Sequence, residues 1–194
     1  QTEYPMMSGG NTISVATVLL ETGMIPMKEP VTEFFLEAPA GLIAITAECS
    51  NGKVTQVTFK NVPAFVEYLD AEIDVPTLGK VKVDVAWGGM YYCIIDSRQF
   101  DWLKLVPEQG KEIARISALC MKAAQEQLPV AHPDYPGVGI SISEIHGPTD
   151  NPNADWKSVN TVFTNDINFD DPTTWTGALD RCACGTGTCA IMAV

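Results

Sequence analysis

The chain has 194 residues, 46% of them apolar, which fits one large domain or two small lobes with enough apolar side chains for a core. Its net charge is −12, and an acidic surface repels the phosphates of nucleic acids and anionic membranes. Because no apolar run reaches the roughly 18 residues that span a bilayer, we expect neither a nucleic-acid nor a membrane partner. A small carboxylate substrate stays compatible with this charge, since N–H groups at a helix start can outweigh the global field.

The first residues lack the basic segment and the cleavage pattern of a signal peptide, so a cytoplasmic location is the expectation. The chain begins with Gln1 rather than Met, so a leader segment could have preceded it.

A glycine-rich turn, Ser8-Gly9-Gly10-Asn11, precedes an apolar stretch. The pattern predicts a helix over residues 12–22, with Asn11 as its N-cap and Gly23 closing it in the left-handed conformation. Because the stretch is apolar on nearly every side, we expect the helix to be buried in the centre of a domain.

Strand patterns with β-branched and aromatic residues follow over residues 33–38, 42–49, 53–60, 80–86 and 90–96. Asn51-Gly52 predicts a hairpin with a type I′ turn. Acidic residues, Pro76 and Gly79 mark residues 70–79, which we interpret as a crossover between two lobes. The first lobe is therefore expected over residues 1–77 and the second over residues 78–194.

Apolar residues recur at helical spacing over residues 108–128, between Pro107 and Pro129, and predict an amphipathic helix. Two further strands are predicted over residues 139–145 and 158–163. His132 is predicted at the surface and His146 in a loop.

A second glycine-rich turn, Cys184-Gly185-Thr186-Gly187, begins another apolar helix, and the chain stops at Val194. A helix that has barely begun buries little and would hardly hold together alone. We therefore expect a fragment of a longer protein that lacks the N-terminal part of the first lobe and the C-terminal part of the second.

Cys184 has two chemical advantages at a helix start. The helix dipole favours a thiolate, and the glycines let N–H groups approach an anion such as a carboxylate. A thiolate beside a bound carboxylate can remove the weakly acidic proton on the adjacent carbon. Two alternatives stay open: a small thiol packed in a turn, and a metal site with Cys182 and Cys189. The spacing of these cysteines is poor for zinc, and no His lies nearby in the sequence.

The turn at Ser8 is a matching cradle, and its alternative is a plain helix cap. Together the two turns predict a carboxylate held between two helix N-termini, with Ser8 and Cys184 on opposite sides of the α-carbon.

Three segments resemble motifs of the proline racemase family. The segment Asp180–Thr188 (DRCACGTGT) resembles the second catalytic motif, DRSPCGTGT, and SGGNT with its apolar helix resembles the first, usually MCGH. The segment Asp84–Tyr92 (DVAWGGMYY) resembles a DxAYGGNF strand. The resemblance covers essentially the whole chain, whereas members of the family are longer at both ends.

This resemblance implies an α/β (α+β) fold of two pseudo-symmetric lobes, each a curved mixed sheet around a central apolar helix, similar to diaminopimelate epimerase. It implies an enzyme without a cofactor, whose partner is a small-molecule substrate, proline or a hydroxyproline, and the cysteine spacing leads us to expect no metal. A homodimer is the candidate assembly of the protein.

The resemblance also implies site residues. Ser8 and Cys184 are the catalytic pair. The substrate-binding residues flank them in the two motifs: Gly9, Gly10, Asn11, Asp180, Gly185 and Thr186. Gly185 and Thr186 supply N–H groups to the substrate carboxylate, and Asp180 pairs with the ring ammonium.

Two departures from the family pattern bear on the reaction: Ser8 replaces the first catalytic Cys, and Gly10 replaces the usual His. A serine is a poor base unless it is activated, whereas β-elimination needs one base and an acid that helps the 3-hydroxyl to leave as water. We therefore expect dehydration of trans-3-hydroxy-L-proline to a pyrroline carboxylate. Alternatives are a 4-hydroxyproline 2-epimerase or proline racemase, a non-catalytic amino-acid-binding protein, and a redox or metal protein that uses the cysteine cluster.

Overall fold

A computed structural model describes residues 5–194. The chain forms two compact units, one ending at Pro63 and the other beginning at Ala64. This division comes earlier in the sequence than the expected boundary after residue 77. Among the described residues, no helix combines the length and apolar character needed to cross a membrane.

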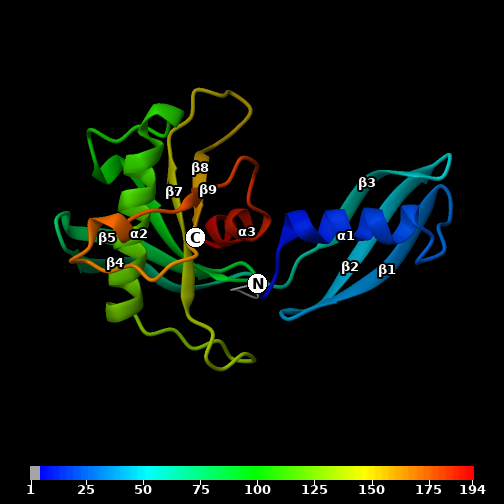
Figure 1. Ribbon diagram of the computed structural model, residues 1–194, viewed down its shortest axis with the longest axis horizontal. Coiled ribbons are helices and arrows are strands. Elements are labelled where there is room, and N and C mark those ends of the chain that lie inside the picture. Colours follow the sequence, from blue (N-terminus) through cyan, green and yellow to red (C-terminus); the bar gives the residue numbers. More distant parts are fainter. Residues whose placement is uncertain (1–4) are drawn as a thin grey trace. The chain divides into compact units, whose positions relative to one another are not determined.

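The unit that ends at Pro63 is one helix laid along a three-stranded sheet (Figure 1). Its elements are α1 (Gly9–Glu21), β1 (Val31–Ala38), β2 (Gly41–Ser50) and β3 (Lys53–Lys60). The strands form an antiparallel meander in the order β1-β2-β3. Asn51 and Gly52 have φ values of 53° and 72°, as a type I′ turn requires, so the predicted hairpin is confirmed.

Helix α1 begins earlier than predicted. Ser8 is its N-cap, with an extended backbone, and its carbonyl accepts the N–H of Thr12 at 2.9 Å. The prediction of Asn11 as N-cap is therefore wrong: Gly9 and Gly10 adopt helical conformation, so Asn11 falls within the first turn. Gly23 follows the helix with a φ of 74°, and its predicted left-handed conformation is confirmed.

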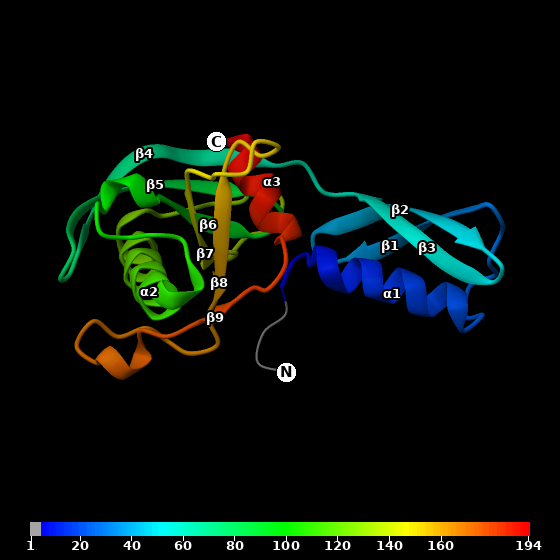
Figure 2. The same cartoon turned by 90° about the horizontal axis from the view of Figure 1, so that it is seen from above.

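Helix α1 buries only one side. Figure 2 shows α1 running alongside the sheet, and Leu20 of the helix is buried in one cluster with Ala47 and Cys49 of β2. Three apolar residues of the helix are exposed by 41% to 54%: Ile13, Val15 and Val18. The expectation of a helix buried on every side is wrong within this unit, because a three-stranded sheet covers one helix face only.

The unit from Ala64 to Val194 is built on a six-stranded mixed sheet. Its strands are β4 (Phe65–Val75), β5 (Gly79–Trp87), β6 (Tyr91–Asp96), β7 (Ile140–Gly147), β8 (Lys157–Val162) and β9 (Ala178–Leu179), paired in that order. Only β6 and β7 are parallel. Helix α2 (Gly110–Gln127) fills the crossover that a parallel pair requires. The helices η1 (Ser97–Gln99), η2 (Pro107–Gln109) and η3 (Pro172–Thr174) are single 3₁₀ turns.

The predicted crossover at residues 70–79 is instead the end of β4 and a hairpin turn. Val75 pairs with Gly79, and Thr77 and Gly79 have φ values of 71° and 81°. The acidic residues of this stretch do not mark a loop, because they alternate with buried Ile73 and Val75 on a strand with one solvated face.

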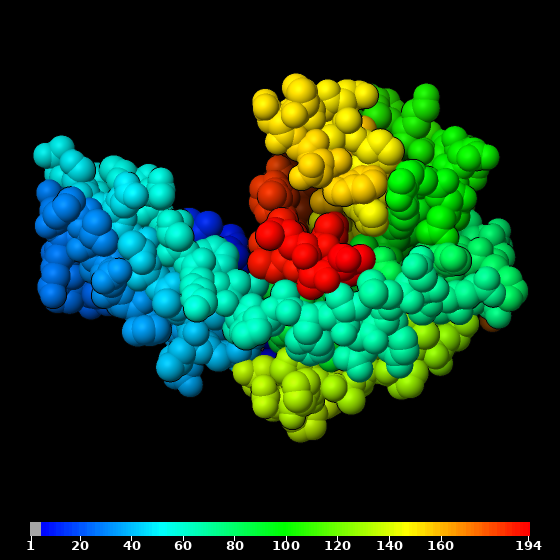
Figure 3. Space-filling view, turned by 180° about the vertical axis from the view of Figure 1, so that it is seen from behind, coloured from blue at the N-terminus to red at the C-terminus, as the bar shows by residue number. Residues whose placement is uncertain are grey.

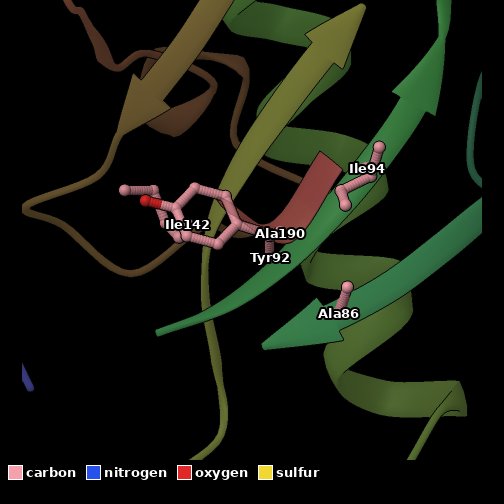
Figure 4. Close-up of a cluster of buried hydrophobic side chains, with 5 residues drawn as sticks. All are labelled: Ala86, Tyr92, Ile94, Ile142 and Ala190. Carbon is pink, nitrogen blue, oxygen red and sulfur yellow. The ribbon is translucent and has the colours of Figure 1, made fainter. Parts of the chain in front are cut away.

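Helices α2 and α3 (Gly185–Ala193) cover opposite faces of this sheet. Tyr92 and Ile94 share a core cluster with Ala190 of α3 (Figure 4). Cys93, on the other side of the pleat, lies near Cys120 of α2. The face of the sheet that carries the Tyr92 side chain therefore lies under α3, and Ala86 of β5 and Ile142 of β7 belong to the same cluster.

The two histidines lie in other settings than predicted. His132 is 9% exposed, because the segment after α2 places its ring 4.4 Å from the ring of Trp87 and 4.6 Å from that of Tyr135. His146 belongs to β7 rather than to a loop, and its ring lies 5.3 Å from that of Trp156.

Substituting Gly88 tests the contact between α3 and the sheet. A Cβ at Gly88 would overlap the Thr186 carbonyl oxygen and lie 2.7 Å from the Ala190 nitrogen, both backbone atoms. Because overpacking is destabilising, we expect Gly88→Ala to lower the free energy of unfolding by about 1–3 kcal/mol. Urea denaturation measures this change. Gly139→Ala is the control, because a Cβ there meets nothing within 4 Å. Equal effects of the two substitutions would contradict this account.

Candidate functional site

The first turn of α3 presents backbone N–H groups at a helix start. Cys184 is the N-cap, with an extended backbone, and its carbonyl accepts the N–H of Thr188 at 2.9 Å. The N–H groups of Gly185, Thr186 and Gly187 therefore have no acceptor within the helix. Together with the helix dipole, they provide an anion-binding turn. Helix α3 lies at the surface of its unit (Figure 3).

The Cys184 thiol is half-buried and belongs to a triangle of polar groups. The Tyr92 hydroxyl lies 3.1 Å from Cys184 Sγ and 2.7 Å from Thr186 Oγ1. The Thr186 hydroxyl lies 3.7 Å from the same sulfur. Tyr92 thus connects β6 to the start of α3 and fixes the direction of the thiol.

The Tyr92 phenol keeps its proton. Burial, followed by the proximity of Cys184, raises its pKa well above the ordinary value. The ring of Tyr92 lies in the core. A buried tyrosine needs a partner for its hydroxyl, and that requirement was the signal for a polar contact that the sequence reasoning missed.

A pocket of about 410 Å³ opens beside Cys184. Its lining residues come from β8 and from the segment that leads into α3: Ser158, Asp180, Arg181, Cys182, Ala183 and Cys184. Asp180 is exposed, its Oδ2 accepts a hydrogen bond from Asn160 Nδ2 at 2.7 Å, and its N–H bonds to the Asn160 carbonyl. The structure therefore brings Asp180 and Cys184, two of the predicted site residues, to one pocket.

A buried carboxyl lies under the same turn. Glu144 of β7 is 1% exposed, and Ser158 Oγ donates a hydrogen bond to its Oε1 at 2.6 Å. Burial, with a smaller contribution from Asp180, raises the pKa of Glu144 to about 7. The sequence reasoning missed this residue, although a lone Glu in an apolar strand is an unusual core residue.

The other predicted residues lie at the start of α1, in the unit that ends at Pro63. Ser8 is half-buried, and its side chain makes no capping hydrogen bond. Gly9 is buried, whereas Gly10 and Asn11 are exposed. The start of α1 is thus a second glycine-rich helix N-terminus whose cap side chain does not bond to its own helix.

The six cysteines are free thiols. Cys93 and Cys120 are buried. Cys182 is exposed and Cys189 is half-buried. Within residues 5–194, no group of three or more His, Cys, Asp or Glu side chains is placed to hold a metal ion.

Comparison with known proteins gives consistent matches. A family model described as "Proline racemase" matches residues 1–194. The structure is similar to a probable proline racemase from Agrobacterium radiobacter K84 with bound carbonate, with a TM-score of 0.83 and 32% identity. It is also similar to a hydroxyproline epimerase from Agrobacterium vitis with bound trans-4-OH-L-proline, with a TM-score of 0.82 and 34% identity. Each match covers 97% of this chain and 51% of the other, so the chain spans about half the length of these proteins.

Tyr92→Phe tests the contact between the phenol and the thiol. The substitution keeps the ring in the core and removes the only group that can donate from β6 to Cys184 Sγ among the contacts of residues 5–194. Hydrogen bonds to charged groups contribute about 1.5–3 kcal/mol, so we expect alkylation of Cys184 by iodoacetamide near neutral pH to slow by about tenfold or more. Peptide mass spectrometry measures each cysteine separately.

Two controls accompany this measurement. Tyr91→Phe removes a hydroxyl that bonds to Glu67 instead, and it should leave Cys184 alkylation unchanged. Exposed Cys182 should react equally in all variants. Unchanged alkylation of Cys184 in Tyr92→Phe would show that the phenol does not act on the sulfur.

Proposed function

The chain belongs to the proline racemase family, and we propose that it removes the α-proton of a hydroxyproline without a cofactor. The observation that carries the proposal is the position of Cys184: at the start of α3, beside a pocket that also contains the Asp180 carboxylate. A carboxylate, an ammonium group and the carbon between them are the features of an amino acid. The turn, Asp180 and Cys184 offer one partner for each.

Each group then has a role in the reaction. The N–H groups of Gly185 and Thr186 bind the substrate carboxylate and stabilise the negative charge that spreads onto it when the α-proton leaves. Asp180 pairs with the ring ammonium. The Cys184 thiolate takes the α-proton, and Tyr92 and Thr186 hold the sulfur in place.

Dehydration of trans-3-hydroxy-L-proline is the reaction that we favour. The Cys184 thiolate takes the α-proton, the electron pair forms the double bond between C2 and C3, and the C3–O bond breaks. The hydroxyl leaves as water with a proton supplied by an acid, which the motif assigns to Ser8. The product is a pyrroline carboxylate. The cycle closes when the proton on Cys184 passes to solvent and Ser8 takes up a proton from solvent. A serine hydroxyl suits proton donation better than proton removal.

A 2-epimerase of 4-hydroxyproline is the second candidate. The similarity to a hydroxyproline epimerase with bound trans-4-OH-L-proline supports it. Epimerisation needs a second competent group on the opposite face of the α-carbon, which Ser8 would have to provide. The two proposed reactions use the same motifs and differ in the role of Ser8: it donates a proton in the dehydration and exchanges one with the α-carbon in the epimerisation.

Proton NMR in heavy water distinguishes the reactions. The protein is incubated separately with trans-3-hydroxy-L-proline, trans-4-hydroxy-L-proline and L-proline. We expect the α-proton signal of the first to disappear as a pyrroline carboxylate forms. Deuterium incorporation with a new diastereomer of the second would identify the epimerase. Binding without change of any of the three would identify an amino-acid-binding protein and contradict the enzymatic proposal.

Cys184→Ala and Cys182→Ala form a matched pair for this assay. Both thiols lie at the same pocket, two residues apart. Loss of a general base costs about 10²–10⁴-fold in rate, so Cys184→Ala should lose activity on that scale, whereas Cys182→Ala should keep it. Equal losses would assign the activity to the packing of the segment rather than to one thiol.

A further inference from the structure

Glu144 is a buried carboxyl that the proposed chemistry does not use. Its Oε2 has no hydrogen-bond partner among the described residues, and a Cβ at Gly187 would overlap this oxygen. Its Oε1 accepts one hydrogen bond, from Ser158. The carboxyl therefore lies directly against the first turn of α3. Ionisation there would bury a charge with half of its acceptors unused, which costs far more than burying a neutral acid.

The location of this carboxyl makes its charge matter. The first turn of α3 carries the positive end of the helix dipole and the N–H groups that bind a carboxylate in the proposed function. An ionised Glu144 against that turn would repel the bound carboxylate through an interior of low dielectric constant. A neutral Glu144 would not. The two negative charges compete for one turn.

We propose that Glu144 is a positioning residue for this anion site: its carboxyl holds a proton when the first turn of α3 binds a carboxylate, so ligand binding takes up a proton. The inference rests on the proposed function, because it needs the ligand carboxylate at Gly185 and Thr186. It adds Glu144, a titratable group on the sheet beneath α3, to an anion site that was inferred from the motif at the start of α3.

The groups around Glu144 set the direction of the pH dependence. The titratable side chains that interact with it from neighbouring elements are Tyr92 on β6 and Asp180 after β9. Burial raises the pKa of Glu144 to about 7, the Ser158 hydrogen bond lowers it, and Asp180 raises it. Glu144 is thus neutral below about pH 7 and ionised above. Anion binding should be tightest below that pH and weaken as the pH rises through it.

Calorimetric binding of pyrrole-2-carboxylate tests the proposal. This planar carboxylate has a trigonal α-carbon, as after proton removal, and its ring nitrogen does not titrate between pH 6 and 8.5. We expect the wild-type protein to bind it more weakly at pH 8.5 than at pH 6, by about tenfold for two charges in partial contact. Glu144→Gln, which is permanently neutral, should bind equally at both pH values and about tenfold more tightly than wild type at pH 8.5.

Two further variants make the test specific. Ser158→Ala removes the hydrogen bond that favours ionised Glu144, so the weakening should move to higher pH. Glu67→Gln neutralises a carboxyl that bonds to Tyr91 on β6, and it should keep the wild-type pH dependence. If Glu144→Gln does not fold, as judged by circular dichroism, Ser158→Ala alone decides: an upward move supports the proposal, and an unmoved midpoint overturns it.

The outcomes separate this inference from the proposed function. Equal wild-type affinity at both pH values overturns the inference and leaves the anion site intact. The same holds if the weakening persists in Glu144→Gln, which assigns it to another group such as the Cys184 thiol. Absence of binding at every pH in the wild-type protein overturns the anion site itself, and with it both proposals.

Discussion

The close approach of α3 to the sheet is the constraint on which the candidate site depends. Two glycines allow it: Gly88, after β5, meets the Thr186 carbonyl, and Gly187 meets Glu144 and the ring of Tyr92. A side chain at either position would hold the helix away from the sheet. Only at this separation can the Tyr92 hydroxyl reach both Cys184 and Thr186. The direction of the thiol and of the first-turn N–H groups follows from this contact.

Two carboxyl groups lie close to the first turn of α3, although this turn is suited to bind an anion. The chain carries a net charge of −12, and two of its acids, Asp180 and Glu144, lie at or under the start of α3. Their settings differ: Asp180 is exposed and can pair with a cation, whereas Glu144 is buried and titrates near neutrality. Burial therefore lets Glu144 stay neutral below about pH 7, although it lies directly under the turn. A neutral Glu144 keeps the turn attractive to a carboxylate in an acidic protein.

The periodicity of apolar residues predicted most of the fold. It failed where acidic residues or glycines, which are common in loops, belong instead to a strand or a helix. The strands at residues 33–60, the Asn51-Gly52 hairpin and helix α2 have local signals and were found. Strand β4 was missed because its acidic residues face solvent on a strand. The start of α1 was misplaced because Gly9 and Gly10 are helical there. Such choices are decided by tertiary contacts that no local pattern contains.

The sequence could predict only those site residues that lie close together in the chain. Cys184 and its glycines form a contiguous motif, so sequence reasoning found them, and Asp180 belongs to the same motif. Tyr92, Glu144 and Ser158 come from three strands, and they meet under α3 only through the order of the sheet. Their types gave a weak signal, a hydroxyl or a carboxyl in an apolar strand, without naming a partner.

Backbone amide shifts test most directly whether the start of α3 binds a carboxylate. Protein labelled with ¹⁵N is titrated with pyrrole-2-carboxylate at pH 6, and each amide proton is followed in heteronuclear spectra. The account predicts that the largest downfield shifts occur at Gly185, Thr186 and Gly187, whose N–H groups gain a charged acceptor. Saturable binding with these three amides unmoved, and the shifts clustered elsewhere, would contradict it.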